Sequence, residues 1–249
     1  MIQSALAAGA TLVAVAFAMS TFDRWLARRR RHELAWSIAL ALFAAGALFL
    51  WLGAAAGWTL PIFRGFYLFG AVINVPVLAL GTVYLLAGRR AGDRAALAVG
   101  AFAAFAAGVI ASAPAHAITD PTVLPQGSDV FEALPRVLAA VASGGGALVV
   151  LGGAAWSAWQ LRGRGRLRRG RRMWANVVIA AGTLVLGASG LLNSVLGEME
   201  AFAVTLAVGV SILYAGFLLA VTPARRPAPP AIPAAAPSPP SLVESGPRN

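Results

Sequence analysis

The sequence predicts an all-α protein, a bundle of seven transmembrane helices with the N-terminus outside and the C-terminus in the cytoplasm. Of its 249 residues, 59% are hydrophobic and only 12% are charged, about half the charged fraction of an ordinary soluble domain. The mean hydropathy is +0.76. Apolar stretches alternate with arginine-rich segments along the chain. Together these observations exclude an ordinary soluble globular domain and favour a polytopic membrane protein.

The seven predicted spans are long enough to cross the hydrocarbon core, which takes about 20 apolar residues. None has Asp, Glu, Arg or His in its interior. The spans cover residues 4–22, 35–57, 65–87, 95–113, 137–161, 173–196 and 201–221, and together they make up a membrane domain over residues 1–221. The first span has no basic segment before it, so we expect an uncleaved helix rather than a signal peptide.

Arginines set the predicted orientation. The chain has 20 basic residues, all arginine, and all but Arg64 and Arg136 fall in segments 23–34, 88–94, 162–172 and 222–249. Cytoplasmic loops carry an excess of basic residues, so these four segments are predicted to face the cytoplasm. This distribution favours an odd number of spans. We therefore expect a multi-pass protein of a bacterial plasma membrane.

The segment 222–249 is predicted to be a disordered cytoplasmic tail. It is rich in proline, which removes backbone donors and blocks helix formation. It also has little apolar surface to bury. The alternative is a proline-rich ligand for a docking domain, although no specific PxxP cluster stands out.

The residue inventory excludes several kinds of chemistry. The chain has no cysteine and no lysine, so disulfides, thiolate metal sites and Schiff bases are excluded. Its two histidines, His32 and His116, are predicted on opposite sides of the membrane, and pairing His116 with Asp120 gives only a weak metal signal. We expect no catalytic centre, metal or cofactor, and therefore no enzyme. The alternative is a reaction at the outer surface that uses His116, Asp120 or Glu198. The net charge of +11 is explained by loop orientation, so no nucleic-acid partner is expected.

Polar residues concentrate around the third predicted span. Pro76 has no N–H, so the carbonyl of Val72 loses its normal helical donor, and a kink there would open a small polar site. The alternative is a purely structural kink with Asn74 bonded to a neighbouring helix. Asn193, near the outer end of the sixth span, either lines the same vestibule or only caps a helix end. The residues proposed for ligand binding are Arg64, Tyr67, Asn74, Pro76, Thr82 and Asn193.

Two function classes follow from these features. The first is an integral membrane protein that binds a small or lipid-like ligand or scaffolds membrane partners, including a second copy of itself. The second is a small-solute transporter with a polar midplane site around Asn74. The expected lipid contacts are anionic headgroups, bound by arginines of two cytoplasmic loops, although the same charges could serve orientation alone. These arginines are Arg28, Arg29, Arg30, Arg31, Arg168, Arg169, Arg171 and Arg172.

Small residues at every fourth position predict where helices pack closely, because lipid tails give no hydrophobic drive for helix association. The fourth span carries Gly100, Ala104, Gly108 and Ser112 on one stripe. The fifth carries Ser143-Gly144-Gly145-Gly146 and Gly152-Gly153, and the sixth carries Gly182, Gly187, Ser189 and Gly190. These patterns predict that the fourth to sixth helices form the tightly packed centre of the bundle.

Two resemblances accompany this interpretation. The segment from Phe66 to Pro76, followed by Leu78-Ala79-Leu80-Gly81-Thr82, is similar to uncharacterised multipass proteins of high-GC actinobacteria. This resemblance covers about one helix and implies no known activity. SWEET sugar transporters also have seven helices and a third-helix asparagine, which Asn74 resembles. The chain departs from them because its first, second, fifth and sixth spans have no proline and it shows no internal repeat.

Overall fold

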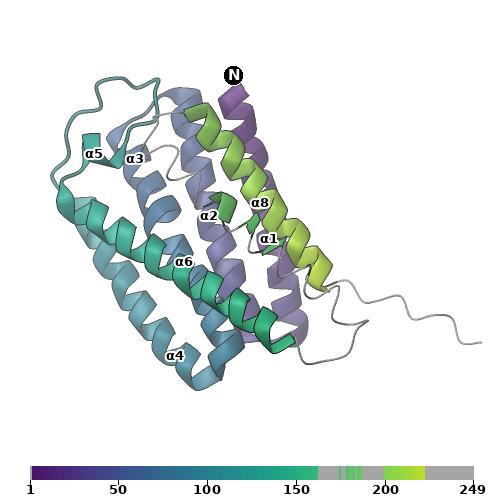
Figure 1. The fold of residues 1–249 in the computed structure, drawn as a ribbon. Helices are drawn as coiled ribbons and strands as arrows, with labels where there is room; N and C mark the ends of the chain where they lie inside the picture. The colour runs from purple at the N-terminus through teal and green to yellow at the C-terminus, as the bar shows by residue number, and fades with distance from the viewer. Residues whose placement is uncertain are drawn as a thin grey trace, which may run out of the picture.

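The computed structural model describes residues 2–161 and 199–221, together with residues 174, 178–179, 181–182 and 184–186. The described residues are helical apart from turns and loops, with one isolated bridge between Ala115 and Phe131. The all-α fold class is therefore confirmed for this part of the chain. The N-terminus and the short helix α5 lie at one end of the molecule, and the turn within α4 lies at the other (Figure 1). The predicted tail, residues 222–249, lies outside the described residues.

Helices α1 (Ile2–Arg28) and α2 (Arg31–Ala56) form an antiparallel hairpin. Only Arg29 and Arg30 lie between them, and Arg29 turns the chain with a positive φ of 53°. Both helices extend further than the predicted spans 4–22 and 35–57. The predicted cytoplasmic loop 23–34 is therefore almost entirely helical, which brings its charged residues into the bundle.

The third and fourth predicted spans form a second hairpin. It begins with α3 (Leu60–Phe66), continues as the π-helical segment η1 (Tyr67–Ile73) and ends with α4 (Asn74–Ser112). Within α4, Gly88 has φ 80° and ψ −176°, a conformation open to glycine but strained for other residues. The chain reverses direction at Gly88. The reversal brings Tyr84, which precedes Gly88, within hydrogen-bonding distance of Asp93, which follows it. We call residues 74–87 the first arm of α4 and residues 89–112 its second arm.

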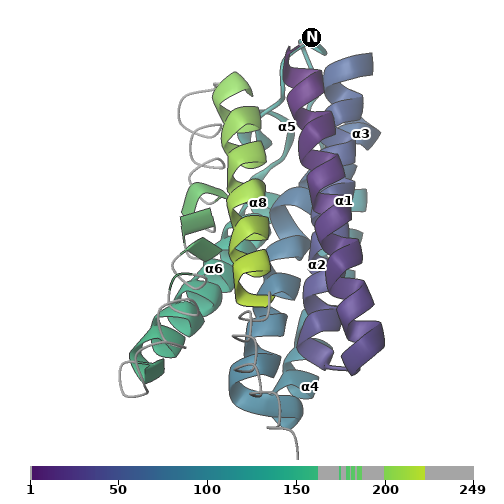
Figure 2. The same cartoon turned by 90° about the vertical axis from the view of Figure 1, so that its right-hand side faces the viewer.

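The remaining described helices are α5 (Gly127–Val130), α6 (Ala133–Leu161) and α8 (Met199–Val221). α6 packs against η1 and α4, and α8 packs against α1. Figure 2 shows α8 beside α1, with α6 diverging from the bundle toward its lower end. Of the sixth predicted span, residues 173–196, only a few residues are described, and they meet α8: a Cβ on Gly182 would lie 2.8 Å from the backbone nitrogen of Leu213.

Three helical stretches are long and apolar enough to cross a membrane by length and composition. They are Arg31–Ala56, Leu60–Ser112 and Ala133–Trp156. The second of these contains the reversal at Gly88 and so consists of two antiparallel helices. Large apolar side chains, such as Leu12, Leu97 and Leu148, are exposed on these and neighbouring helices. These features fit a membrane protein, whose outward surface contacts lipid rather than water.

The small-residue prediction is wrong for the fourth span. Gly100, Ala104, Gly108 and Ser112 are exposed on the second arm of α4, and a Cβ on Gly100 or Gly108 would meet no described atom within 4 Å. A close approach of two backbones instead joins α2 to η1, where a Cβ on Gly46 would lie 2.9 Å from the Cα of Gly70. The spacing of small residues shows which helix faces are able to pack closely. It does not show which of these faces contact one another in the folded protein.

The end of the bundle that carries α5 (Figure 1) holds an aromatic cluster. Trp58 contacts Phe63 and Phe66, and Phe63 in turn contacts Tyr67 and Phe131 with centroids 5.7 and 5.6 Å apart. Trp58 is 2% exposed, so it belongs to the core rather than to the lipid-water interface expected of tryptophans near span ends. The loop that folds back over Trp58 buries it, and the backbone N–H of Trp58 donates to the carbonyl of Pro121 in that loop.

Candidate functional site

The centre of the third predicted span contains a polar site where helical geometry changes. The segment η1 has π-helical geometry, with hydrogen bonds to the fifth residue instead of the fourth, and α-helix resumes at Asn74, two residues before Pro76. Proline cannot donate to the carbonyl four residues earlier, and its ring crowds that carbonyl. The wider turns before Pro76 relieve this conflict, so the irregularity predicted at Pro76 takes the form of a π-helical segment.

Asn74 is the buried polar residue of this site. Its side chain is 7% exposed, and its carboxamide oxygen has no hydrogen-bond partner within the described part of the chain. An amide oxygen buried without a partner costs about 1–3 kcal/mol. The Asn74 oxygen therefore either destabilises the fold or accepts a hydrogen bond from a bound ligand.

The backbone near Asn74 accepts a hydrogen bond from a second helix. Ser143 of α6 donates its hydroxyl to the carbonyl of Ala71 in η1 at 2.5 Å. Further along α6, glycines lie against the first arm of α4: a Cβ on Gly146 would lie 2.8 Å from the Val75 side chain, and one on Gly153 would overlap the Thr82 side chain. The sequence predicted a freed carbonyl at Val72, whereas this interhelical bond is made one residue earlier.

The other residues proposed for ligand binding occupy different places. Arg64 donates from Nη2 to the carbonyl of Ala113 at 2.7 Å and closes the capped end of the α3–α4 hairpin. Tyr67 lies in the aromatic cluster, and Thr82 contacts the Gly153 position of α6. Asn193 lies outside the described residues. The structure thus places Asn74 and Pro76 at the polar site, with Arg64 and Tyr67 above it and Thr82 below.

The predicted outer loop forms a cap over this end. The backbone N–H of His116 donates to the carbonyl of Val130 at 2.9 Å, and Leu124, Val130 and Phe131 are buried against the aromatic cluster. The cap covers the aromatic cluster, which lies between the cap and the polar site at Asn74.

The structure does not support a metal site at His116 and Asp120 in this loop. His116 and Asp120 are both exposed, and the described residues contain no group of three or more metal-ligating side chains. Asp120 instead accepts hydrogen bonds from the hydroxyl and backbone amide of Thr122, and these bonds lower the pKa of its carboxyl. This arrangement makes a local loop turn.

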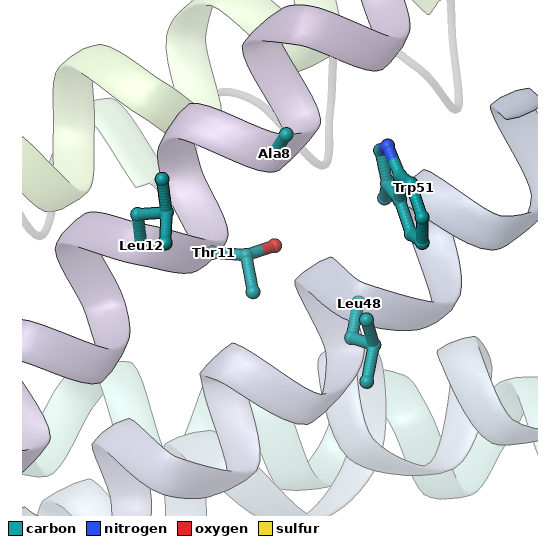
Figure 3. Close-up of a pocket in the computed structure, with 5 residues that line it drawn as sticks. All are labelled: Ala8, Thr11, Leu12, Leu48 and Trp51. Atoms are coloured by element: carbon teal, nitrogen blue, oxygen red, sulfur yellow. The ribbon is translucent and has the colours of Figure 1, made fainter.

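An apolar groove lies between α1 and α2, away from the polar site. It has a volume of about 230 Å³ and is lined by Ala8, Thr11, Leu12, Leu48 and Trp51 (Figure 3). The hydroxyl of Thr11 is already donated to the carbonyl of Ala7, so the groove offers hydrocarbon contact and little hydrogen bonding.

A buried ion pair was missed by sequence reasoning. Arg24 of α1 donates from Nη2 to Oε1 of Glu33 in α2 at 3.0 Å, and the Glu33 side chain is 1% exposed. The guanidinium also lies over the ring of Phe217 in α8, 4.9 Å from its centroid. Both charges were predicted to be loop residues, so the expectation of no buried acid or base was wrong at this point. The sequence feature that could have predicted this ion pair is the opposite charge of Arg24 and Glu33, nine positions apart on either side of a predicted turn.

The chain has no counterpart in the comparisons with known proteins. No protein-family model matches it, and no significant match was found among curated proteins or solved structures. Any functional conclusion therefore rests on the residues and their geometry.

Proposed function

We propose that this protein is a multi-pass membrane protein of seven helices that binds a small or lipid-like ligand at the polar site around Asn74. In this proposal the N-terminus and the cap face outside, and the arginine-rich turns face the cytoplasm of a bacterial plasma membrane. The observation that carries the proposal is the buried, unpartnered oxygen of Asn74 beside a π-helical segment. Buried polar groups are costly in membrane helices, and π-helical segments frequently accompany functional sites.

The chemistry of the site narrows the ligand. The Asn74 oxygen accepts hydrogen bonds, so the ligand carries an N–H or O–H donor, and the surrounding side chains of Val72 and Val75 favour an otherwise apolar molecule. A hydroxylated or amide-bearing lipid or a small amphipathic solute has this character. No acid, base or metal is needed for binding, which agrees with a non-enzymatic role.

Native mass spectrometry in mild detergent tests the proposal. The wild-type protein is expected to carry a molecule of defined mass, and the Asn74→Leu variant is expected to lose it while unfolding at the same or a higher temperature. Thr21→Val is the matched control, because Thr21 is also buried but bonds only carbonyls of its own helix. Retention of the molecule by Asn74→Leu would place binding elsewhere. A lower melting temperature without a bound molecule would assign Asn74 to packing.

Transport is the second candidate function, favoured by the change of helical geometry within the third predicted span. Transporters bind substrates where a membrane helix is interrupted near the bilayer centre. Counterflow of labelled solutes in vesicles would distinguish the two functions. Saturable flux lost in Asn74→Leu supports transport, whereas binding without flux supports a ligand-binding or scaffolding protein.

A further inference from the structure

Exposed arginines from two distant turns gather at the end of the bundle opposite the cap. Arg28 ends α1, Arg29 and Arg30 form the turn to α2, and Arg90 and Arg94 follow the reversal at Gly88. An ion pair between Arg31 and Asp93 joins the two turns directly. We call the five exposed arginines the basic rim.

Asp93 joins the α1–α2 turn to the reversal at Gly88, and nearby arginines neutralise its charge. Besides Arg31, it accepts a hydrogen bond from the Tyr84 hydroxyl at 2.9 Å, and Arg89 Nε lies 3.8 Å from its second oxygen. Arg31, which was predicted to contact lipid headgroups, and Arg89 are therefore engaged within the protein. The predicted lipid contacts Arg168, Arg169, Arg171 and Arg172 lie outside the described residues. By contrast, the five arginines of the basic rim form no ion pair with any described residue. Their charge is available to an external anion.

Exposed hydrocarbon lies next to the basic rim on both hairpins. Phe22 and Leu26 are exposed on the last turns of α1, and Leu85 and Leu86 are exposed just before Gly88. The guanidinium of Arg29 stacks over the ring of Trp25 at 4.9 Å, which is typical of the interface between lipid tails and headgroups. The exposed apolar side chains thus lie within about two helical turns of the arginines of the basic rim.

We propose that the basic rim is a binding surface for anionic phospholipids, with phosphate on the arginines and acyl chains along Phe22, Leu26, Leu85 and Leu86. The planar guanidinium pairs with phosphate through two parallel hydrogen bonds. A nucleic acid or an acidic protein would satisfy the arginines but leave the adjoining hydrocarbon in water. This surface rests on the membrane-spanning part of the proposed function and is independent of the ligand at Asn74.

The test measures retention of phosphatidylglycerol against phosphatidylcholine by native mass spectrometry of protein extracted from vesicles containing equal amounts of both. One variant, R28Q/R29Q/R30Q, changes the first turn, and another, R90Q/R94Q, changes the second. Arg136→Gln is the control, because Arg136 is equally exposed but lies at the capped end. Each lost arginine near a membrane surface weakens anionic lipid binding about fivefold. We expect the phosphatidylglycerol preference to fall at least tenfold in both rim variants and to be unchanged in the control.

Three results would overturn the proposal. These are unchanged lipid preference in both rim variants, an equal loss in Arg136→Gln, and displacement of the lipid by millimolar inorganic phosphate, which would identify a phosphate site. Binding of duplex DNA that depends on the same arginines, without phosphatidylglycerol preference, would assign the surface to nucleic acid. Thermal unfolding of every variant separates lost binding from lost folding. Loss of the ligand in Asn74→Leu with intact lipid preference separates this surface from the Asn74 site.

Discussion

Arg24 and Glu33 form an ion pair 3.0 Å long across the turn between α1 and α2, and the ring of Phe217 covers the guanidinium. Only one oxygen of Glu33 is bonded. Its second oxygen and two guanidinium nitrogens of Arg24 are buried without a described partner. The pair therefore links three helices while leaving part of its hydrogen-bonding capacity unused.

Breaking this pair should be strongly destabilising. We expect Glu33→Gln and Arg24→Gln each to lower the free energy of unfolding by about 3–5 kcal/mol, because each leaves a buried charge without its counter-ion. The measurement is denaturant unfolding in mixed micelles. The double variant R24M/E33L should recover most of this loss, since well-packed apolar residues often replace a buried pair without penalty. A double variant as unstable as the single ones would contradict this explanation.

The contact between α2 and η1 should be sensitive to one added methyl group. Gly46→Ala is expected to lower the free energy of unfolding by about 1–3 kcal/mol, because the new Cβ would lie 2.9 Å from the Cα of Gly70 and backbone cannot easily move. Gly100→Ala is the control. That position is open, so alanine should be neutral or stabilise its helix by up to about 1 kcal/mol. Equal effects at the two positions would show that the close approach is absent.

The bond from Ser143 to Ala71 should stabilise the π-helical segment. Ser143→Ala is expected to cost about 1 kcal/mol, within the range for hydrogen bonds between membrane helices. Ser211→Ala serves as the control, because the Ser211 hydroxyl is exposed and bonds only the carbonyl of Ala207 on its own helix. Hydrogen exchange of residues 67–75 should rise in the first variant and stay unchanged in the second.

The loop turn at Asp120 should depend on pH. Bonds from Thr122 lower the pKa of the folded carboxyl, so the stabilisation is complete above the unfolded pKa of about 4 and is lost as pH falls through the folded value. Thr122→Ala removes the hydroxyl donor and should raise the Asp120 pKa toward its ordinary value. Carboxyl ¹³C titration measures this shift. Ser128→Ala, which leaves the Asp120 contacts in place, should not move it.

Much of the helical layout could be predicted from the sequence. Long apolar stretches separated by charge are enough to indicate helices, because a backbone in hydrocarbon must satisfy its own hydrogen bonds. The two hairpins and the reversal between residues 87 and 95 follow this pattern. Likewise, Pro76 predicted a helical irregularity near Asn74, because a missing donor has a local consequence that needs no partner helix. The seven-span count and the orientation remain predictions.

Sequence alone, then, determined which segments are helical and apolar and where the proline disturbs them, since these depend on the chain's own backbone and composition. Only the tertiary structure decided which faces meet: Gly46 against Gly70, Ser143 on Ala71, and Glu33 buried with Arg24 while Gly100 stays open. The reason is physical. Lipid is as apolar as a neighbouring helix, so hydrophobicity does not distinguish a buried face from an exposed one. Close packing and the pairing of rare polar groups make that choice, and both depend on residues far apart in the chain.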